Sequence, residues 1–191
     1  MIHELRIYEF RPNALPNYMA LAGGNALTIR GPELGVLYGF WLAKRGDADI
    51  AVHLWTYDSL NHRQAVRESL TVNARWNDEF VRHILPTLQS QEVRFLSPLG
   101  CMRPAQVAQG AYSLQTFETR PGELTAALKD AQERLAEMPE LVQVYTGISP
   151  WPNSVSMLLR GDATQLFDVP LKGSTLKERI SMSPSQFSPL Q

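Results

Sequence analysis

The sequence predicts an α+β protein built from two tandem copies of one strand–helix–strand–strand–helix unit. Two observations support this fold class: the chain repeats itself, and short segments rich in β-branched and aromatic residues alternate with helical segments. The chain has 191 residues, a length that suits one large domain or two small ones. Hydrophobic residues make up 44% of it, which is enough to build an ordinary globular core.

The repeat becomes visible when residues 2–15 are aligned with residues 111–124. The matching pairs occur in the same order in both copies: Leu5 and Leu114, Tyr8 and Phe117, Glu9 and Glu118, Arg11-Pro12 and Arg120-Pro121, Leu15 and Leu124, Pro32-Glu33-Leu34 and Pro139-Glu140-Leu141, Tyr38 and Tyr145, Leu54 and Leu158, and Asp58 and Asp162. A shared order of this kind is typical of a duplicated unit. We therefore predict a first unit over 1–98, a linker over 99–110 and a second, degenerate unit over 111–191.

Local signals give the elements of the first unit. Alternation of side-chain types predicts a strand over 2–10, which Pro12 ends before a helix over 14–26. The turn Arg45-Gly46-Asp47 separates two further strands, and Asp58 is suited to cap the next helix. The remaining predicted elements are strands over 34–43, 50–57 and 92–96 and helices over 59–72 and 74–87.

The second unit follows the same plan. We predict a strand over 111–118, a helix over 122–137, strands over 141–148 and 154–160, and a helix capped by Asp162. The Ser/Pro-rich end of the chain predicts either a final strand or an irregular segment. A sheet with helices on one face leaves its other face bare, and exposing apolar surface costs about 25 cal/mol per Å². The two sheets are therefore expected to pack face to face or to curl into one barrel.

Three segments of the first unit resemble the NIPSNAP family. They are Glu4-Leu5-Arg6-Ile7-Tyr8, Gly35-Val36-Leu37-Tyr38-Gly39-Phe40-Trp41 and Val52-His53-Leu54-Trp55-Thr56-Tyr57-Asp58-Ser59-Leu60, with Arg63, Val66, Arg67 and Trp76 following. The second unit has Met157-Leu158-Leu159-Arg160 where the first has His53-Leu54-Trp55-Thr56. The resemblance implies two ferredoxin-like units that pack sheet to sheet as a dimeric α/β barrel. It also implies that a ligand would lie inside the barrel or between sheet and helices.

The strands of the first unit carry the candidate site residues. A period of two places Leu5 and Ile7 on one face of the first strand and Arg6 and Tyr8 on the other. We expect the leucine and isoleucine to face the helices and the polar residues to face the barrel interior. The resulting ligand-binding candidates are Arg6, Tyr8, Tyr38, Trp41, His53 and Trp55, with His53 as the candidate catalytic residue.

Structural interpretations of the same residues stay open. Glu4 and Arg6 could pair with the other sheet, and Trp41 and Trp55 could belong to the core. His53 could be a hydrogen-bonded structural residue. Arg63 and Arg67 lie four apart on one helix face, which is either solvated or the rim of an anion site.

Composition and motifs exclude several classes of function. The net charge of -1 gives no positive electrostatic field that would attract nucleic acid. No run of apolar residues is long enough to cross a membrane. The single cysteine, Cys101, allows neither a disulfide within the chain nor a thiolate zinc site. No metal or cofactor motif is present, and haem would need His53 or a tyrosine as axial ligand. The first residues do not resemble a signal peptide, so a cytoplasmic location is expected.

Three functions fit these residues. The first is binding of a small apolar or aromatic metabolite in the barrel interior, without a cofactor. The second is a non-enzymatic interaction or scaffold role, as expected for a NIPSNAP-like protein without established chemistry. The third is a cofactor-independent monooxygenase or isomerase, which fold analogy alone suggests. We expect a homodimer, although two units in one chain could also complete the barrel by themselves.

Overall fold

A closed antiparallel barrel organises the parts of the chain that the computed structural model describes, residues 1–100, 110–161 and 170–191. Within them, eight strands run around the barrel in the order β1-β3-β2-β8-β5-β7-β6-β4. Their bounds are β1 (Ile2–Phe10), β2 (Val36–Arg45), β3 (Ala48–Tyr57), β4 (Leu88–Leu99), β5 (Tyr112–Thr119), β6 (Leu141–Ser149), β7 (Ser154–Arg160) and β8 (Ser174–Pro184). The four strands β1 to β4 are neighbours in this order, as are β5 to β8.

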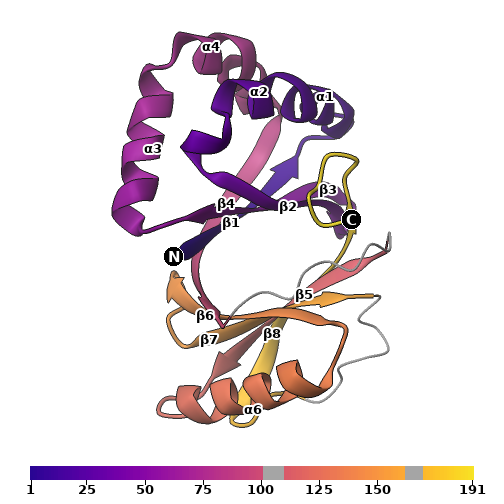
Figure 1. The fold of residues 1–191 in the computed structure, drawn as a ribbon. Coiled ribbons are helices and arrows are strands. Elements are labelled where there is room, and N and C mark those ends of the chain that lie inside the picture. Colours follow the sequence, from indigo (N-terminus) through magenta and orange to yellow (C-terminus); the bar gives the residue numbers. More distant parts are fainter. Residues whose placement is uncertain (101–109, 162–169) are drawn as a thin grey trace.

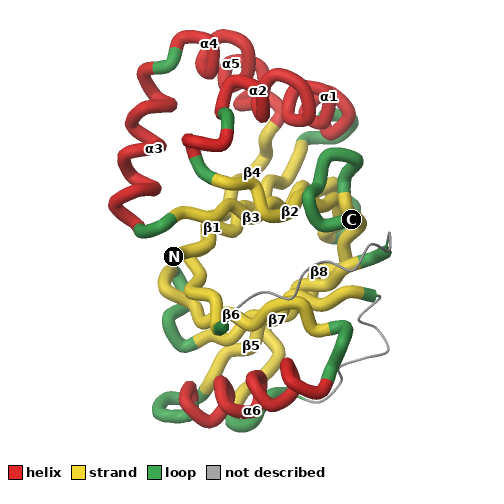
Figure 2. The backbone as a smooth tube through the Cα atoms, viewed as in Figure 1, coloured by secondary structure: helices red, strands yellow, loops and turns green. Residues whose placement is uncertain are grey.

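The helices form two layers on opposite sides of the barrel (Figures 1 and 2). One layer covers strands β1 to β4 and contains α1 (Leu15–Leu21), the π-helical turn η1 (Ala22–Ala26), α2 (Leu27–Arg30), the 3₁₀ turn η2 (Pro32–Leu34), α3 (Leu60–Val72), α4 (Ala74–Trp76), the π-helical turn η3 (Asn77–Val81), α5 (Arg82–Ile84) and the 3₁₀ turn η4 (Leu85–Thr87). The other layer is α6 (Leu124–Glu137), which covers β6 and β7.

Two strand pairings close the barrel between these halves. β4 pairs with β6 along residues 95–99, and β2 pairs with β8 over the three residues Trp41, Leu42 and Ala43. The chain then continues past β8, and the backbone N–H of Ser185 donates to the carbonyl oxygen of Phe40 at 2.9 Å. The C-terminal residues therefore lie against β2, next to the first helical layer (Figure 1).

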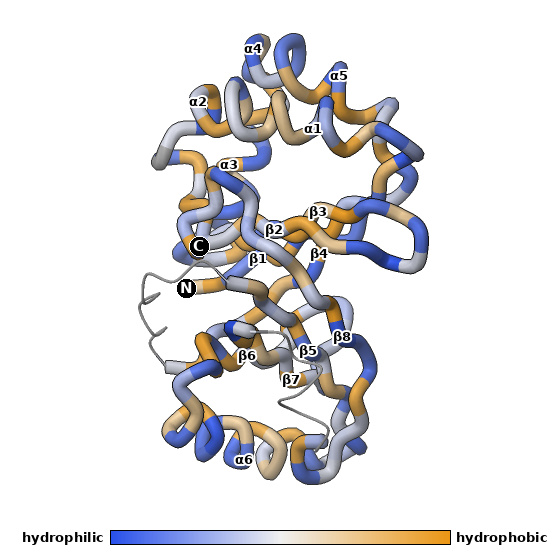
Figure 3. The backbone as a smooth tube through the Cα atoms, turned by 90° about the vertical axis from the view of Figure 1, so that its right-hand side faces the viewer, coloured by the Kyte–Doolittle hydropathy of each residue, from blue (hydrophilic) through white to orange (hydrophobic). Residues whose placement is uncertain are grey.

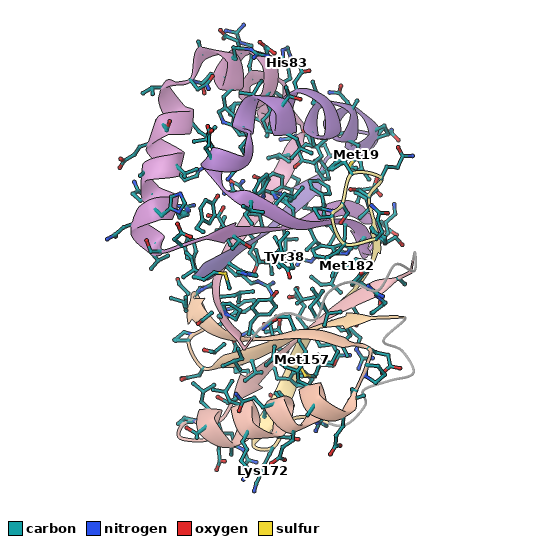
Figure 4. All side chains as sticks on the ribbon, in the orientation of Figure 1. Met19, Tyr38, His83, Met157, Lys172 and Met182 are labelled. Atoms are coloured by element: carbon teal, nitrogen blue, oxygen red, sulfur yellow. The ribbon has the colours of Figure 1, made fainter. Side chains whose placement is uncertain are left out.

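Side chains fill three apolar regions. One lies inside the barrel, one lies between β1 to β4 and their helices, and one lies under α6. Figure 4 shows Tyr38 and Met182 directed into the space between the two sheets, and Met157 between the sheet and α6. Strands β2 and β3 are mostly hydrophobic, whereas hydrophobic and hydrophilic positions alternate along α6 (Figure 3).

The predicted orientation of the first strand is wrong. Leu5, Ile7 and Leu54 lie inside the barrel, where they pack with residues of β5 and β7. Arg6 and Tyr8 lie beneath the helices instead, as do His53 and Trp55. Arg6 has its partners, Glu4 and the Tyr8 hydroxyl, on the helical side, whereas the face that carries Leu5 and Ile7 meets apolar residues of β5 and β7. The helical layer adds Arg63, which pairs with Glu4, and Arg30, which donates to the Tyr57 hydroxyl.

Most predicted elements are present with shifted ends. The strand predicted over 92–96 extends over Leu88–Leu99, so residue 99 belongs to it and not to the predicted linker. Ser59, and not Asp58, caps α3, because its hydroxyl accepts from the backbone N–H of His62 at 3.0 Å. The last strand is β8, which was one of the two alternatives predicted for this part of the chain. The predicted cap Asp162 and Cys101 lie outside the described residues.

His3 makes stability depend on pH. It is 1% exposed, lies between the rings of Tyr38 and Tyr145, and burial followed by the nearby N-terminal charge lowers its pKa to about 4. The unfolded chain binds a proton near pH 6.5 while the folded chain does not. The free energy of unfolding should therefore decrease as pH falls below 6.5, by up to about 1.4 kcal/mol per pH unit.

Chemical denaturation between pH 5 and 7.5 tests this expectation. The His3→Gln variant should have a flatter dependence on pH than the wild type, and the exposed His83→Gln variant should match the wild type. A His3→Gln curve parallel to the wild-type curve would contradict it.

Candidate functional site

A cavity of about 40 Å³ lies between the outer face of β1, β2 and β3 and the first helical layer. This volume is room for roughly three water molecules. Its lining consists of Arg6, Tyr8, Phe40, His53 and Trp55 from strands, Tyr18, Ala22, Ala26, Leu27, Arg30, Arg67, Trp76 and Phe80 from helices and π turns, and Phe187 from the C-terminal segment. Aromatic rings thus surround a small number of cationic and hydrogen-bonding groups.

His53 is the central polar group of this cavity. It is 4% exposed, its ring stacks on Phe40 at 5.1 Å, and Tyr8 meets it edge-on at 4.7 Å. The Nε1–H of Trp55 donates to its Nδ1 at 2.6 Å. Because an indole nitrogen can only donate, Nδ1 must accept, and the proton of the neutral imidazole is on Nε2. No described residue accepts from that Nε2–H, although it is buried.

The charge state of His53 follows from the same surroundings. Burial lowers its pKa well below the ordinary value, and the positive charges of Arg6, Arg30 and Arg67 lower it further. His53 is therefore neutral at pH 7 and acts as a hydrogen-bond donor through Nε2. A general base would need a free Nδ1 or an unprotonated Nε2, and this arrangement provides neither.

Glu4 forms ion pairs with Arg6, which lines the cavity, and with Arg63. Arg6 Nη1 donates to its Oε1 at 2.5 Å, and Arg63 of α3 donates to its Oε2. Burial alone would raise the pKa of Glu4, but the charges of and hydrogen bonds from Arg6 and Arg63 leave it below its usual value. Arg6 Nε also donates to the hydroxyl of Tyr8 at 2.8 Å. The predicted pairing of Glu4 and Arg6 with the other sheet is therefore wrong, since they pair with each other and with α3.

The two remaining arginines differ in their partners. Arg30 is buried, with its guanidinium 3.7 Å above the Trp55 ring, and donates to the Leu34 carbonyl and to the Tyr57 hydroxyl. Arg67 lines the cavity but has no hydrogen-bond or ion-pair partner among the described residues. Burial, followed by the charge of Arg6, lowers the pKa of Arg67. Of the three arginines that line the cavity, Arg67 is the one without a hydrogen-bond partner among the described residues.

Two irregular turns and the C-terminal segment shape the other walls. The π-helical turns η1 and η3 contribute Ala22, Ala26 and Phe80, and π turns inside helices frequently occur at functional sites. Phe187 packs on Phe40 with ring centres 4.8 Å apart. It also lies so close to Gly23 that a Cβ there would be 2.5 Å from its ring.

Four of the six predicted ligand-binding residues meet in this cavity: Arg6, Tyr8, His53 and Trp55. Tyr38 and Trp41 do not, because both belong to the barrel interior. Trp41 pairs with Val52, a residue of the same interior cluster. Tyr38 reaches that side because a register shift in β2 between Leu37 and Gly39 gives it no partner of its own on β3. Sequence reasoning missed Arg30 and Phe187, whereas the alternative of an anion-site rim included Arg67.

Two features are absent from the described parts of the chain. No three of their His, Cys, Asp or Glu side chains lie close enough together to hold a metal ion. None of their helices has the length and apolar character needed to cross a bilayer.

Comparison with known proteins identifies the family. The NIPSNAP family model matches residues 3–102, which is just over half of the chain. The chain belongs to the NIPSNAP family. It is 29% identical over 129 residues to human Protein NipSnap homolog 3A, an alignment that covers 64% of the chain and 49% of the relative. It is 34% identical over 101 residues to zebrafish Protein NipSnap homolog 2, covering 51% and 33%.

These relatives are longer than the chain, which spans half or less of their length. The whole fold also has a counterpart among solved structures. A proposed monooxygenase from Fusobacterium nucleatum superposes with a TM-score of 0.67 over 96% of this chain and 91% of its own, at 12% identity. At that identity the similarity is one of fold alone. This NIPSNAP chain therefore shares its mixed α/β fold with that structure.

The Trp55–His53 hydrogen bond can be tested directly. Nitrogen-15 NMR of the wild type should show His53 as one neutral tautomer with the proton on Nε2, unchanged between pH 5 and 8. In Trp55→Phe, Nδ1 loses its donor, so we expect mixed tautomers and a free energy of unfolding lower by about 1–3 kcal/mol. Trp76→Phe, a change in the same cavity, should leave the His53 signals alone. A charged His53 at pH 7 would contradict the assignment.

Proposed function

We propose that this NIPSNAP chain binds a small organic molecule with an apolar or aromatic part in the cavity beneath α1 to α4. The observation that carries the proposal is the buried Nε2–H of His53, which has no acceptor among the described residues. Leaving such a donor unpaired costs about 1–3 kcal/mol, and an acceptor atom on a ligand would recover that energy. This location replaces the barrel interior that the sequence suggested.

We also infer that the chain is a tandem pair of ferredoxin-like units, approximately 1–98 and 111–191. The strand orders β4-β1-β3-β2 and β8-β5-β7-β6 are equivalent under this division. The aligned residues Leu5 and Leu114 both belong to the barrel-interior cluster, which supports it. Only the first unit would hold the ligand, because apolar residues such as Met157 and Leu159 fill the matching positions beneath α6.

Binding is favoured over two other functions. Base catalysis by a monooxygenase or isomerase would require His53 to accept a proton, whereas its Nδ1 is occupied and burial lowers its pKa. A purely structural scaffold would have no use for an unpaired donor and an unpaired cation facing one cavity. A homodimer in the cytoplasm stays a prediction, which light scattering and cell fractionation would test.

Changes in cavity size test the proposal, with benzamide as a neutral aromatic probe. The ring of benzamide exceeds the space available beside Phe187, so Phe187→Ala should bind it at least tenfold more tightly than the wild type, about 1.4 kcal/mol. Ala26→Leu fills the cavity and should abolish binding in the same background. Ala20→Leu, a matched change at an exposed position of α1, should have no effect.

Calorimetry on the whole chain measures these affinities, with circular dichroism to verify folding. Equal benzamide binding by Phe187→Ala with and without Ala26→Leu would place the probe elsewhere and refute the proposed pocket. Absence of binding in all four proteins would refute the proposed function.

A further inference from the structure

The described lining of the cavity includes several groups that can donate hydrogen bonds, among them His53 Nε2–H and the guanidinium of Arg67. We infer that its ligand is a carboxylate, with one oxygen accepting from His53 Nε2–H and the other from the guanidinium of Arg67. This inference rests on the proposed small-molecule binding and specifies its chemistry.

The charges around the cavity are unbalanced. Arg6, Arg30 and Arg67 line it, and no acidic residue does among those that the structure describes. Arg6 pairs with Glu4, whose other carboxylate oxygen accepts from Arg63. Arg67 is partly exposed, so burial removes part of its hydration without supplying a partner. A bound anion would restore the balance at Arg67.

The available donors match a carboxylate better than other ligand groups. Arg30 already donates from Nε to the Leu34 carbonyl and from Nη2 to the Tyr57 hydroxyl, whereas Arg67 has no hydrogen-bond or ion-pair partner among the described residues. A carboxylate has two oxygens and no proton at pH 7, so both oxygens can accept hydrogen bonds. A neutral amide would satisfy His53 but would leave the charge of Arg67 uncompensated.

The cavity size and lining also discriminate between anions. A carboxylate head group is small enough for a cavity of about 40 Å³. Phosphate is bulkier, carries more charge and has oxygens on every side, whereas the rings of Phe40, Phe80 and Phe187 provide no donors for them. The organic part of the acid would extend towards Phe187, which the C-terminal segment contributes to the cavity wall.

Benzoate and benzamide provide a nearly isosteric pair of probes that differ in charge. Their dissociation constants are measured by calorimetry for the whole chain, in the wild-type and Phe187→Ala backgrounds. We expect benzoate to bind at least tenfold more tightly than benzamide. Arg67→Gln should reduce this ratio at least fivefold, and Arg67→Lys should retain most of it. Arg75→Gln, which removes a solvent-exposed arginine of α4, should leave the ratio unchanged.

A second readout reports on His53 without relying on affinity. Saturating benzoate should shift the nitrogen-15 and proton signals of His53 Nε2–H, because the proton gains an acceptor, and the Trp55-bonded Nδ1 should move less. Denaturation curves show whether Arg67→Gln is folded. If it is unfolded, the Arg67→Lys variant and this NMR shift still decide the question.

The outcomes separate the two proposals. Benzamide binding that equals benzoate binding, with no effect of Arg67→Gln, would overturn the carboxylate while leaving the pocket in place. Tighter binding of inorganic phosphate than of benzoate would also overturn it. Absence of binding by either aromatic probe in both backgrounds would remove the proposed function itself.

Discussion

In a closed barrel, one face of each strand points into the interior and the other points outwards. Strands β1 and β3 alternate between two faces, so Leu5 and Leu54 inside the barrel oblige Arg6 and His53 to point outwards. Both halves contribute apolar side chains to the interior, where Leu5 and Leu54 pack in one cluster with Leu114. Polar residues of the first half therefore meet beneath the helices, where Glu4 can bind both Arg6 and Arg63.

This constraint explains which parts of the fold were predictable. The order of strands and helices follows from local signals such as Pro12 and the Arg45-Gly46-Asp47 turn, and the structure has them in that order. Which face of each strand points into the barrel was not predictable in the same way. A period of two separates Leu5 from Arg6 but does not say which side carries the helices, and a helical layer can accept charged residues when it supplies their partners.

The candidate site was predictable in part for similar reasons. Arg6, Tyr8, His53 and Trp55 share a face in two paired strands, so alternation and pairing bring them together wherever that face points. The bulge at Tyr38 breaks the alternation in β2 and removes Tyr38 from the group, whereas Trp41 pairs with Val52 on the interior face. Phe187 arrives from the far end of the chain, and the spacing of residues near the site gives no indication of it.

The matching positions of the second half show what the fold alone requires. Beneath α6 the outward-facing positions of β7 hold Met157 and Leu159, which pack into an apolar cluster with Val155. The same strand geometry is thus satisfied by residues that carry no hydrogen-bonding groups. The barrel fold therefore does not require His53 and Trp55 at these positions. An unpaired buried donor beside an arginine without a partner lowers stability, and the ligand proposed for this cavity would recover that energy.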